Sequence, residues 1–172
     1  MLLLDEPFSH IDNFRKNALR RNLFAYLKNQ NIACIVATHD SADALSFSDQ
    51  IVVVKEGRIV QVDDAIVVYQ NPHNRYVGSL FGEINEIQKS IFDLQASETE
   101  TILCYPYQLK QSENGLLKVH VRKSFYKGNH FLVKAVYSKT IIFFEHPIEL
   151  HFNDVVFEIS YRCMERQKSG IR

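Results

Sequence analysis

Several features that assign a chain to a common functional class are absent from this sequence of 172 residues. The 20 basic and 20 acidic side chains cancel, so no net charge indicates binding to nucleic acid or to an anionic membrane surface. Glycine is scarce, with six residues in all, and no two of them stand five apart before a lysine. The phosphate-cradling motif G-x-x-x-x-G-K-S/T is therefore excluded from this sequence.

Disulfide, metal and membrane signatures are also missing. The cysteines Cys34, Cys104 and Cys163 are far apart, without C-x-x-C spacing, which supports neither a disulfide framework nor a zinc site and fits a reducing cytosol. The longest aliphatic runs, such as residues 51–54, fall far short of the roughly 20 residues that a membrane span needs. With 46% hydrophobic and 23% charged residues, the composition is typical of a soluble globular chain of one domain or two small ones.

The first part of the chain alternates between strand and helix patterns. The apolar runs at residues 1–4 and 32–37 predict parallel strands covered on both faces. Between them, helical spacing predicts a helix over 13–29 with Asp12 as N-cap. Its expected apolar face is Phe14, Leu19, Leu23, Tyr26 and Leu27, and its expected solvated face is Arg15, Lys16, Arg20 and Arg21. Asp40 or Ser41 then caps a short helix.

Further along, the pattern changes from α/β to all-β. Residues 51–54 and 58–62 predict a hairpin, and helical stretches follow at 65–69 and 75–81. After Gly82 short strands predominate, which predicts a domain boundary there. The expected strands are 101–104, 117–123, 131–137, 140–144 and 155–159. Their number suits a small Greek-key barrel, so we expect an α/β part over 1–82 and an all-β part over 83–172.

The strongest chemical signal is LLLDEP at residues 2–7. A buried strand there delivers Asp5 and Glu6 at its carboxyl end, where open α/β sheets place their ligands. Asp5 could hold a hydrated Mg²⁺, and Glu6 could polarise a water for attack on a phosphoryl group. The alternative is two solvated acids before a proline turn.

Two neighbouring motifs favour the chemical interpretation. SHID follows at residues 9–12, and Thr38-His39-Asp40 stands at the end of the next expected strand, which is adjacent to the first if the crossover is right-handed. His39 could donate a hydrogen bond to a terminal phosphate oxygen. A lone histidine at a strand end is more often a surface residue, so the weight lies on the three motifs together.

In this order the motifs resemble the second half of the ATP-binding subunit of ABC transporters, in particular the importer type with a C-terminal regulatory domain. The resemblance rests on LLLDEPFSHID, VATHDSADALSFSDQIVVVKEGRIVQV and VVYQNPHNRYVGSLFGEIN. It implies that Asp5 is the Walker B aspartate, which holds Mg²⁺ through water, and that Glu6 is the catalytic glutamate. Residues 9–12 are similar to the D-loop, which implies cofactor-binding roles for Ser9 and Asp12, with Asp12 reaching across a nucleotide-bound dimer. His39 matches the switch histidine that contacts the γ-phosphate.

The same resemblance implies fold, cofactors and partners. Residues 1–82 would be the C-terminal part of a P-loop NTPase-type domain, and residues 83–172 an OB- or TOBE-like regulatory β domain. The cofactors would be ATP and Mg²⁺. The partners would be a second copy of the subunit, membrane permease subunits and, indirectly, a periplasmic solute-binding protein, with no nucleic acid. Such a subunit lies in the cytoplasm against the inner face of a bacterial membrane. Iron, polyamine, sulfate, thiamine and sugar importers share these motifs, so no solute is singled out.

The phosphate loop and the signature segment of that family have no counterpart in this sequence, because the glycines they need are absent. We therefore expect a fragment that lacks half of the ATP site, in which a sheet without its remaining strands exposes an apolar face. The alternative function is a non-catalytic regulatory or interaction module that dimerises or binds a small effector through its β domain.

Two further clusters admit a functional and a plain interpretation. The acids and histidines Glu145, His146, Glu149 and His151 could hold a metal, but their spacing favours surface histidines. The aromatic residues between 105 and 144 could stack nucleic-acid bases, but the zero charge balance favours core packing.

Overall fold

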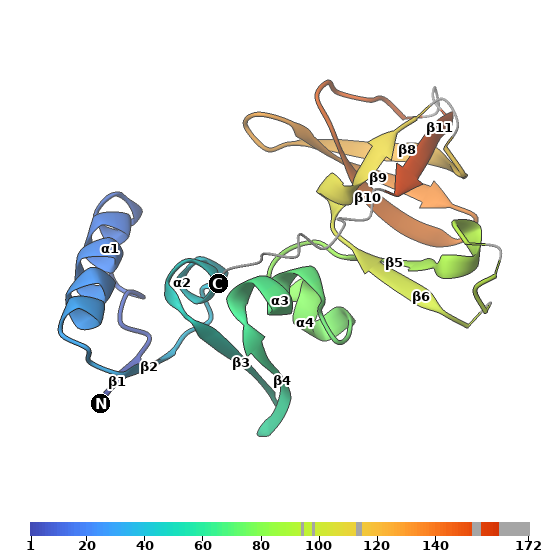
Figure 1. Cartoon of the computed structure of the whole chain (residues 1–172). Helices are drawn as coiled ribbons and strands as arrows, with labels where there is room; N and C mark the ends of the chain where they lie inside the picture. The colour runs from blue at the N-terminus through green and yellow to red at the C-terminus, as the bar shows by residue number, and fades with distance from the viewer. Residues whose placement is uncertain (94, 98, 113–114, 153–155, 162–172) are drawn as a thin grey trace. The chain divides into compact units, whose positions relative to one another are not determined.

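The computed structural model describes residues 1–93, 95–97, 99–112, 115–152 and 156–161. The chain divides after Phe81 into two compact units, called here the first unit and the second unit (Figure 1). The first mixes helices with short strands and the second is rich in β-strands, in agreement with the predicted change from α/β to β. Across the described residues, no helix combines the length and apolarity that crossing a bilayer requires.

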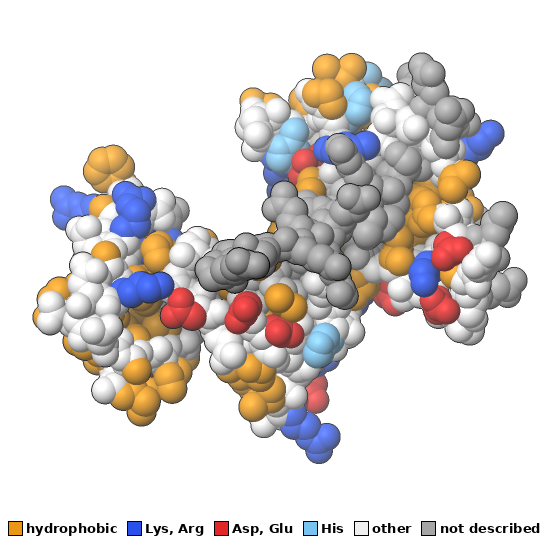
Figure 2. Space-filling model, in the orientation of Figure 1, with side chains coloured by type: hydrophobic (Ala, Val, Ile, Leu, Met, Phe, Trp, Pro, Cys, Tyr) orange, Lys and Arg blue, Asp and Glu red, His pale blue; other side chains and the backbone are white. Residues whose placement is uncertain are grey.

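The first unit begins with a parallel strand pair, β1 (Leu2–Asp5) and β2 (Cys34–Ala37), joined by helix α1 (Asn13–Asn29). Parallel pairing was predicted, but this sheet has two strands within the described residues, and the prediction that both faces are covered is wrong. Leu3 is 66% exposed and Ile35 59% exposed, and hydrophobic side chains reach the surface around β1 and β2 (Figure 2). Successive side chains point to opposite faces of a strand, and only one face is covered here.

Helix α1 has the predicted bounds, with Asp12 at the N-cap, where its carbonyl oxygen accepts from the amides of Arg15 and Lys16. The prediction of its buried face is partly wrong. Phe14 is 94% exposed, whereas Arg20, which was expected on the solvated face, is 5% exposed. The face turned inward is made of residues at helical spacing: Lys16, Arg20, Leu23, Phe24 and Leu27. Two basic residues are turned inward because acidic partners lie opposite them, as described below.

The rest of the first unit is a helix, a hairpin and two short helices: α2 (Ser41–Phe47), β3 (Gln50–Lys55), β4 (Arg58–Asp64), α3 (Ala65–Gln70) and α4 (Arg75–Ser79). Strands β3 and β4 are antiparallel, and their two-residue turn places Glu56 and Gly57 at φ 52° and 74°, the left-handed values that tight hairpins need. Apolar side chains from β3 and both short helices form the core, with Val60 of β4 partly buried against it: Ile51, Val53, Ala65, Val68 and Val77.

The second unit contains an antiparallel pair, β5 (Asn85–Gln88) with β6 (Thr101–Cys104), and a five-stranded antiparallel sheet. The sheet order is β10 (Thr140–His146), β9 (Phe131–Tyr137), β8 (Leu117–Tyr126), β11 (Val156–Tyr161) and β7 (Leu109–Gln111), with short 3₁₀ turns at Lys89–Ile91 and Pro106–Gln108. Leu117, Val119 and Val121 alternate inward along β8 as predicted. Residue 155 of the predicted last strand and Cys163 lie outside the described residues.

In the part of the chain that the structure describes, the predicted small barrel is not closed. The five-stranded sheet has edges at β10 and β7, and these edge strands contact each other without being hydrogen-bonded neighbours. Strand β7 has only three residues and pairs with β11, which leaves too short a ladder to complete a barrel. The sheet is therefore curled but open.

Buried Asn85 joins the strand pair to the sheet of the second unit. Its side-chain amide donates to the carbonyl of Phe143 at 2.7 Å and accepts from the amide of Phe143 at 2.7 Å. Beside it, Cys104 is fully buried, and burial raises the pKa of its thiol to about 12. Such a thiol is unreactive at neutral pH. Apolar packing and the two hydrogen bonds of Asn85 hold the strand pair against the sheet.

Candidate functional site

The carboxyl ends of β1 and β2 bring Glu6 and His39 into contact. Asp5 pairs with Ala37 in the parallel register, and the amide of Glu6 continues the ladder by donating to the carbonyl of Ala37 at 2.9 Å. The backbone amide of His39 donates to Oε1 of Glu6 at 3.0 Å, and Nδ1 of its ring lies 2.6 Å from the same oxygen. One carboxylate oxygen therefore holds both the backbone and the ring of the histidine.

This contact fixes the tautomer of the His39 ring. An ionised carboxylate only accepts hydrogen bonds, so Nδ1 carries the proton that points to Glu6. The other ring nitrogen, Nε2, is then an acceptor in the neutral ring and a donor in the cationic ring. Because the His39 side chain is 81% exposed and that of Glu6 35% exposed, both remain accessible to a ligand.

The backbone at Glu6 adopts a conformation that is uncommon for a residue with a side chain. Its φ is 46°, in the left-handed region that L-residues avoid. The carbonyl of Glu6 accepts from the amide of Ser9 at 3.2 Å and from the Ser9 hydroxyl at 3.0 Å, which holds the turn in place. Left-handed residues of this kind persist where the surrounding structure over-determines them and are frequent at functional sites.

Of the remaining predicted site residues, Ser9 bonds the backbone of Glu6, whereas Asp5 and Asp12 have exposed side chains. Asp5 is exposed at the end of β1, and Asp12 is exposed at the start of α1. Among the described residues, no hydrogen bond connects the Asp12 side chain to Glu6 or His39. A single exposed carboxylate such as Asp5 fits the way in which Mg²⁺ binds few protein oxygens and keeps several waters.

A charged network that the sequence interpretation missed lies directly beside His39. Oδ2 of Asp40 contacts Nζ of Lys16 at 2.8 Å and Nη2 of Arg20 at 2.5 Å, while Nε of Arg20 pairs with Asp43. The hydrogen bond from Lys16, followed by that from Arg20, holds the pKa of Asp40 well below its usual range, although burial acts in the opposite direction. In the sequence, the signal that could have indicated this network was the i, i+4 spacing of Lys16 and Arg20 together with the i, i+3 spacing of Asp40 and Asp43.

Aromatic packing anchors the loop that follows Glu6. Phe8 is 2% exposed and meets Phe24 of α1 edge to face at 5.9 Å, and Phe24 stacks on Phe47 of α2 at 4.8 Å. The guanidinium of Arg20 lies 5.6 Å from the centre of the Phe8 ring. The loop is thus fixed to both helices by one aromatic cluster, which the sequence pattern did not single out.

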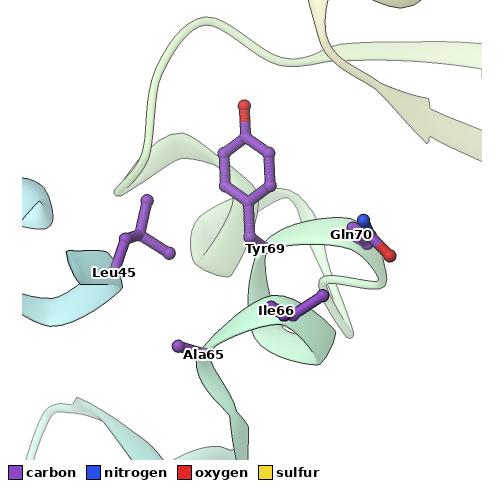
Figure 3. A pocket seen from close by; sticks show the side chains of 5 residues that line it. All are labelled: Leu45, Ala65, Ile66, Tyr69 and Gln70. Carbon is purple, nitrogen blue, oxygen red and sulfur yellow. The ribbon is translucent and has the colours of Figure 1, made fainter. Parts of the chain in front are cut away.

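A small pocket lies elsewhere in the first unit. It has a volume of about 220 Å³ and is lined by Leu45, Ala65, Ile66, Tyr69 and Gln70. Figure 3 shows the Tyr69 ring of α3 standing beside Leu45 of α2. The lining carries no charged side chain and none of the predicted site residues, so it does not suit the phosphates of a nucleotide.

The two other sequence clusters lie in the second unit. Within the described residues, no group of three or more His, Cys, Asp or Glu side chains is arranged to hold a metal. His146 is engaged locally, with Nδ1 2.9 Å from the carbonyl of Ile148. Of the aromatic residues, Tyr105 and Phe144 are buried as core packing requires, whereas Tyr126 is 69% exposed.

Comparison with known proteins identifies similar chains, although no protein-family model matches. The spermidine/putrescine import ATP-binding protein PotA 1 of Pseudomonas aeruginosa is 40% identical over 91 residues, which are 53% of this chain and 25% of that protein. The PotA protein of Ureaplasma parvum is 30% identical over an alignment of 176 positions, covering 91% of this chain and 34% of that protein. The Fe(3+) ions import ATP-binding protein FbpC 2 of Pectobacterium atrosepticum is 37% identical over 83 residues, 48% of this chain and 24% of that protein.

The chain spans about a quarter to a third of the length of these curated relatives. It resembles the ATP-binding subunits of ABC importers, and the resemblance is partial. The resemblance stated from the motifs is thereby confirmed.

Proposed function

We propose that this chain carries the hydrolytic residues of the ATP-binding subunit of an ABC importer, which couples ATP hydrolysis to solute uptake. The observation that supports this most is the contact between Glu6 and His39, which joins two strand ends 33 residues apart in the sequence. The partial resemblance to import ATP-binding proteins supports the same function. Neither residue needs this contact for the packing of a core, since both side chains are accessible.

We assign different roles to the two carboxylate oxygens of Glu6. Oε1 holds His39, and among the described residues no hydrogen bond reaches Oε2. We assign Oε2 the proton of the attacking water, with Glu6 as general base. Nε2 of His39 would donate to the γ-phosphate in the cationic form of the ring, because Nδ1 already donates to Glu6. Asp5 would hold Mg²⁺ through water, and that ion would neutralise charge on the phosphates.

In the proposed assembly, the groups that cradle the phosphates of ATP lie outside this sequence. Because G-x-x-x-x-G-K-S/T is absent from the sequence, the amides and lysine that cradle the phosphates would come from residues outside it. Asp12, with Ser9 in the same loop, would face the nucleotide of a second copy, and permease subunits would hold the pair at the inner face of the membrane. The second unit would be the OB- or TOBE-like regulatory domain, and the first the C-terminal part of the ATPase domain.

The decisive experiment removes the base and keeps its shape. We would purify the gene product with its bound partners from its own host, through an affinity tag on the gene product, and measure Mg-ATP hydrolysis. Glu6→Gln should lower turnover by about 100-fold or more, the lower end of what a general base contributes, while ATP binding persists. Glu56→Gln is the matched control, because Glu56 is exposed and also has a positive φ of 52°. Normal turnover in the Glu6→Gln protein would refute the assignment.

Two observations favour a non-catalytic role: the second unit has a buried core of its own, and the sequence lacks a phosphate loop. The 172-residue chain should therefore show no saturable ATP binding by calorimetry. Micromolar binding by the isolated chain would contradict the need for outside residues. If the native product hydrolyses no ATP with or without its partners, the regulatory module becomes the better proposal.

A further inference from the structure

Two cations of α1 hold the segment on either side of His39. Lys16 and Arg20 stand one helical turn apart on the inward face of α1, and Asp40 and Asp43 lie at the start of α2. Lys16 and Arg20 both reach Oδ2 of Asp40, and Arg20 also pairs with Asp43. Two positive and two negative groups thus neutralise one another beside the candidate site.

The network is too buried to be an incidental surface contact. The side chains of Arg20 and Asp43 are 6% and 4% exposed, and those of Lys16 and Asp40 16% and 26%. Arg20 uses two different nitrogens: Nη2 donates a hydrogen bond to Asp40, and Nε is in ion-pair contact with Asp43 without hydrogen-bond geometry. One planar fork thus faces two carboxylates. Lysine keeps the charge but lacks this fork, so it cannot bridge them in the same geometry.

The network continues into the backbone of the histidine segment. The Thr38 hydroxyl donates to Oδ2 of Asp43 at 3.3 Å and accepts from the amide of Asp40 at 3.0 Å. The side chain of Asp40 also accepts from the amide of Ala42 at 2.9 Å. Both neighbours of His39 are therefore tied to α1, while the amide of His39 itself is left to donate to Glu6.

We infer that Arg20, assisted by Lys16, is a positioning residue for the Glu6–His39 pair. It fixes residues 38–40 so that both the amide and Nδ1 of His39 reach Oε1 of Glu6. The catalytic meaning of this role rests on the proposed function, but the positioning itself does not. The competing explanation is that the network only fastens α1 to α2, in which case its loss lowers stability and leaves the His39–Glu6 contact intact.

The test uses the 172-residue chain and nuclear magnetic resonance. The amide proton shift of His39 and the ¹⁵N shift of its Nδ1 report the contact, and Glu6→Ala, which removes the accepting oxygen, defines the change caused by its loss. Arg20→Lys should produce at least half of that change, while Arg21→Lys, an exposed neighbour on the same helix, should produce none. Unchanged His39 signals in a folded Arg20→Lys chain would overturn the inference, as would a Glu6→Ala chain in which they do not move.

A second variant covers the case in which Arg20→Lys does not fold. Lys16→Gln removes only the less buried cation, and it should move the His39 signals in the same direction by a smaller amount. If Lys16→Gln lowers thermal stability without moving those signals, the network only fastens the helices and the inference is wrong.

Turnover of the native gene product separates this inference from the proposed function. Arg20→Lys should lower kcat by about 10-fold or more, with little change in KM for ATP, since small misplacements of reacting groups are costly. If Glu6→Gln leaves turnover normal, the proposed function fails, while displaced His39 signals in Arg20→Lys still support positioning. If Glu6→Gln abolishes turnover but Arg20→Lys displaces His39 and leaves kcat unchanged, the positioning role in catalysis fails and the function stands.

Discussion

The two units differ in the charged groups that they bury, although each also buries a neutral amide, Gln61 in the first unit and Asn85 in the second. Among the described residues, the buried charged side chains, Arg20 and Asp43, lie in the first unit, where they surround the candidate site. The second unit buries Asn85, a neutral amide that serves the backbone of Phe143. Its core is otherwise aliphatic and aromatic: Ile87, Leu109, Leu117, Val119, Val121, Val133, Ile142 and Phe144.

The difference shows which force organises each part. In the second unit the hydrophobic effect and close packing dominate, since removing apolar surface from water is the main favourable contribution to folding. In the first unit, the histidine segment is held by ion pairs whose geometry matters more than their net energy, because the desolvation of buried charges offsets much of their attraction. The first unit should therefore lose stability in acid and when the guanidinium of Arg20 is replaced. The second unit should lose stability when a substitution leaves a cavity in its core.

The largest expected effect is a cavity in the second unit. Phe144 is fully buried, so Phe144→Ala should lower the free energy of unfolding of that unit by about 3–5 kcal/mol. Urea titration followed through the amide signals of β8 and β9 measures the loss. The His39 signals of the first unit should keep their wild-type positions, because every residue that fixes His39 belongs to the first unit. Movement of those signals would contradict the conclusion that the first unit alone fixes His39.

Acid should act on the first unit with a smaller effect. The pKa of Asp40 is lowered in the folded chain, so its contribution to stability is fully present above its unfolded pKa near 4 and is lost as the pH falls toward the lowered value. We expect a loss of no more than about 1 kcal/mol between pH 5 and pH 3, because the unfolded carboxyl is only partly titrated over this range and part of the folded carboxyl group meets solvent.

Urea titrations at pH 5, 4 and 3, followed through the amide signals of α1, measure this acid effect. Asp40→Asn serves as the control, since it cannot titrate and should remove this part of the pH dependence. An Asp40→Asn chain with the same acid profile as the wild type would show that Asp40 does not carry the effect.

The smallest effect is expected at the most exposed aromatic residue of α1. Phe14 is 94% exposed, so Phe14→Ala should change stability by no more than about 0.5 kcal/mol. Leu27, on the same helix and 5% exposed, is the matched control, and Leu27→Ala should cost about 2–4 kcal/mol. Thermal or urea unfolding of both variants decides whether the inward face of α1 is the one described here. A larger loss for Phe14→Ala would restore the face predicted from the sequence.

Much of the local structure follows from short-range patterns. The bounds of α1, the hairpin of β3 and β4, and the inward alternation of β8 were all predicted, because helical spacing, turn residues and period-two alternation act over a few residues. Strands β5 and β7 were missed, because each is short and contains a single apolar residue, in NEIQ and LKQ, so that neither an apolar run nor an alternation marks it. The closed barrel was predicted from the number of strands, but closure depends on the length of the edge strands.

The candidate site divides in the same way. The placement of Glu6 and His39 at adjacent strand ends was predicted, because parallel pairing aligns carboxyl ends whatever the side chains are. The basic residues of α1 were assigned to solvent, which is correct for Arg15 and Arg21 and wrong for Lys16 and Arg20. A hydropathy scale scores an arginine by its own charge alone. It takes no account of an acid 20 or more residues away in the sequence that pairs with the arginine in the folded chain.

The sequence by itself thus determined which residues stand at the ends of β1 and β2 and where most helices and strands lie. Only the tertiary structure decided which face of α1 turns inward and which carboxylates pair with Arg20. It also decided that the sheet of the second unit curls without closing. The physical reason is that periodicity depends on neighbours in the chain. An ion pair or a sheet edge depends instead on groups that meet only after the chain has folded.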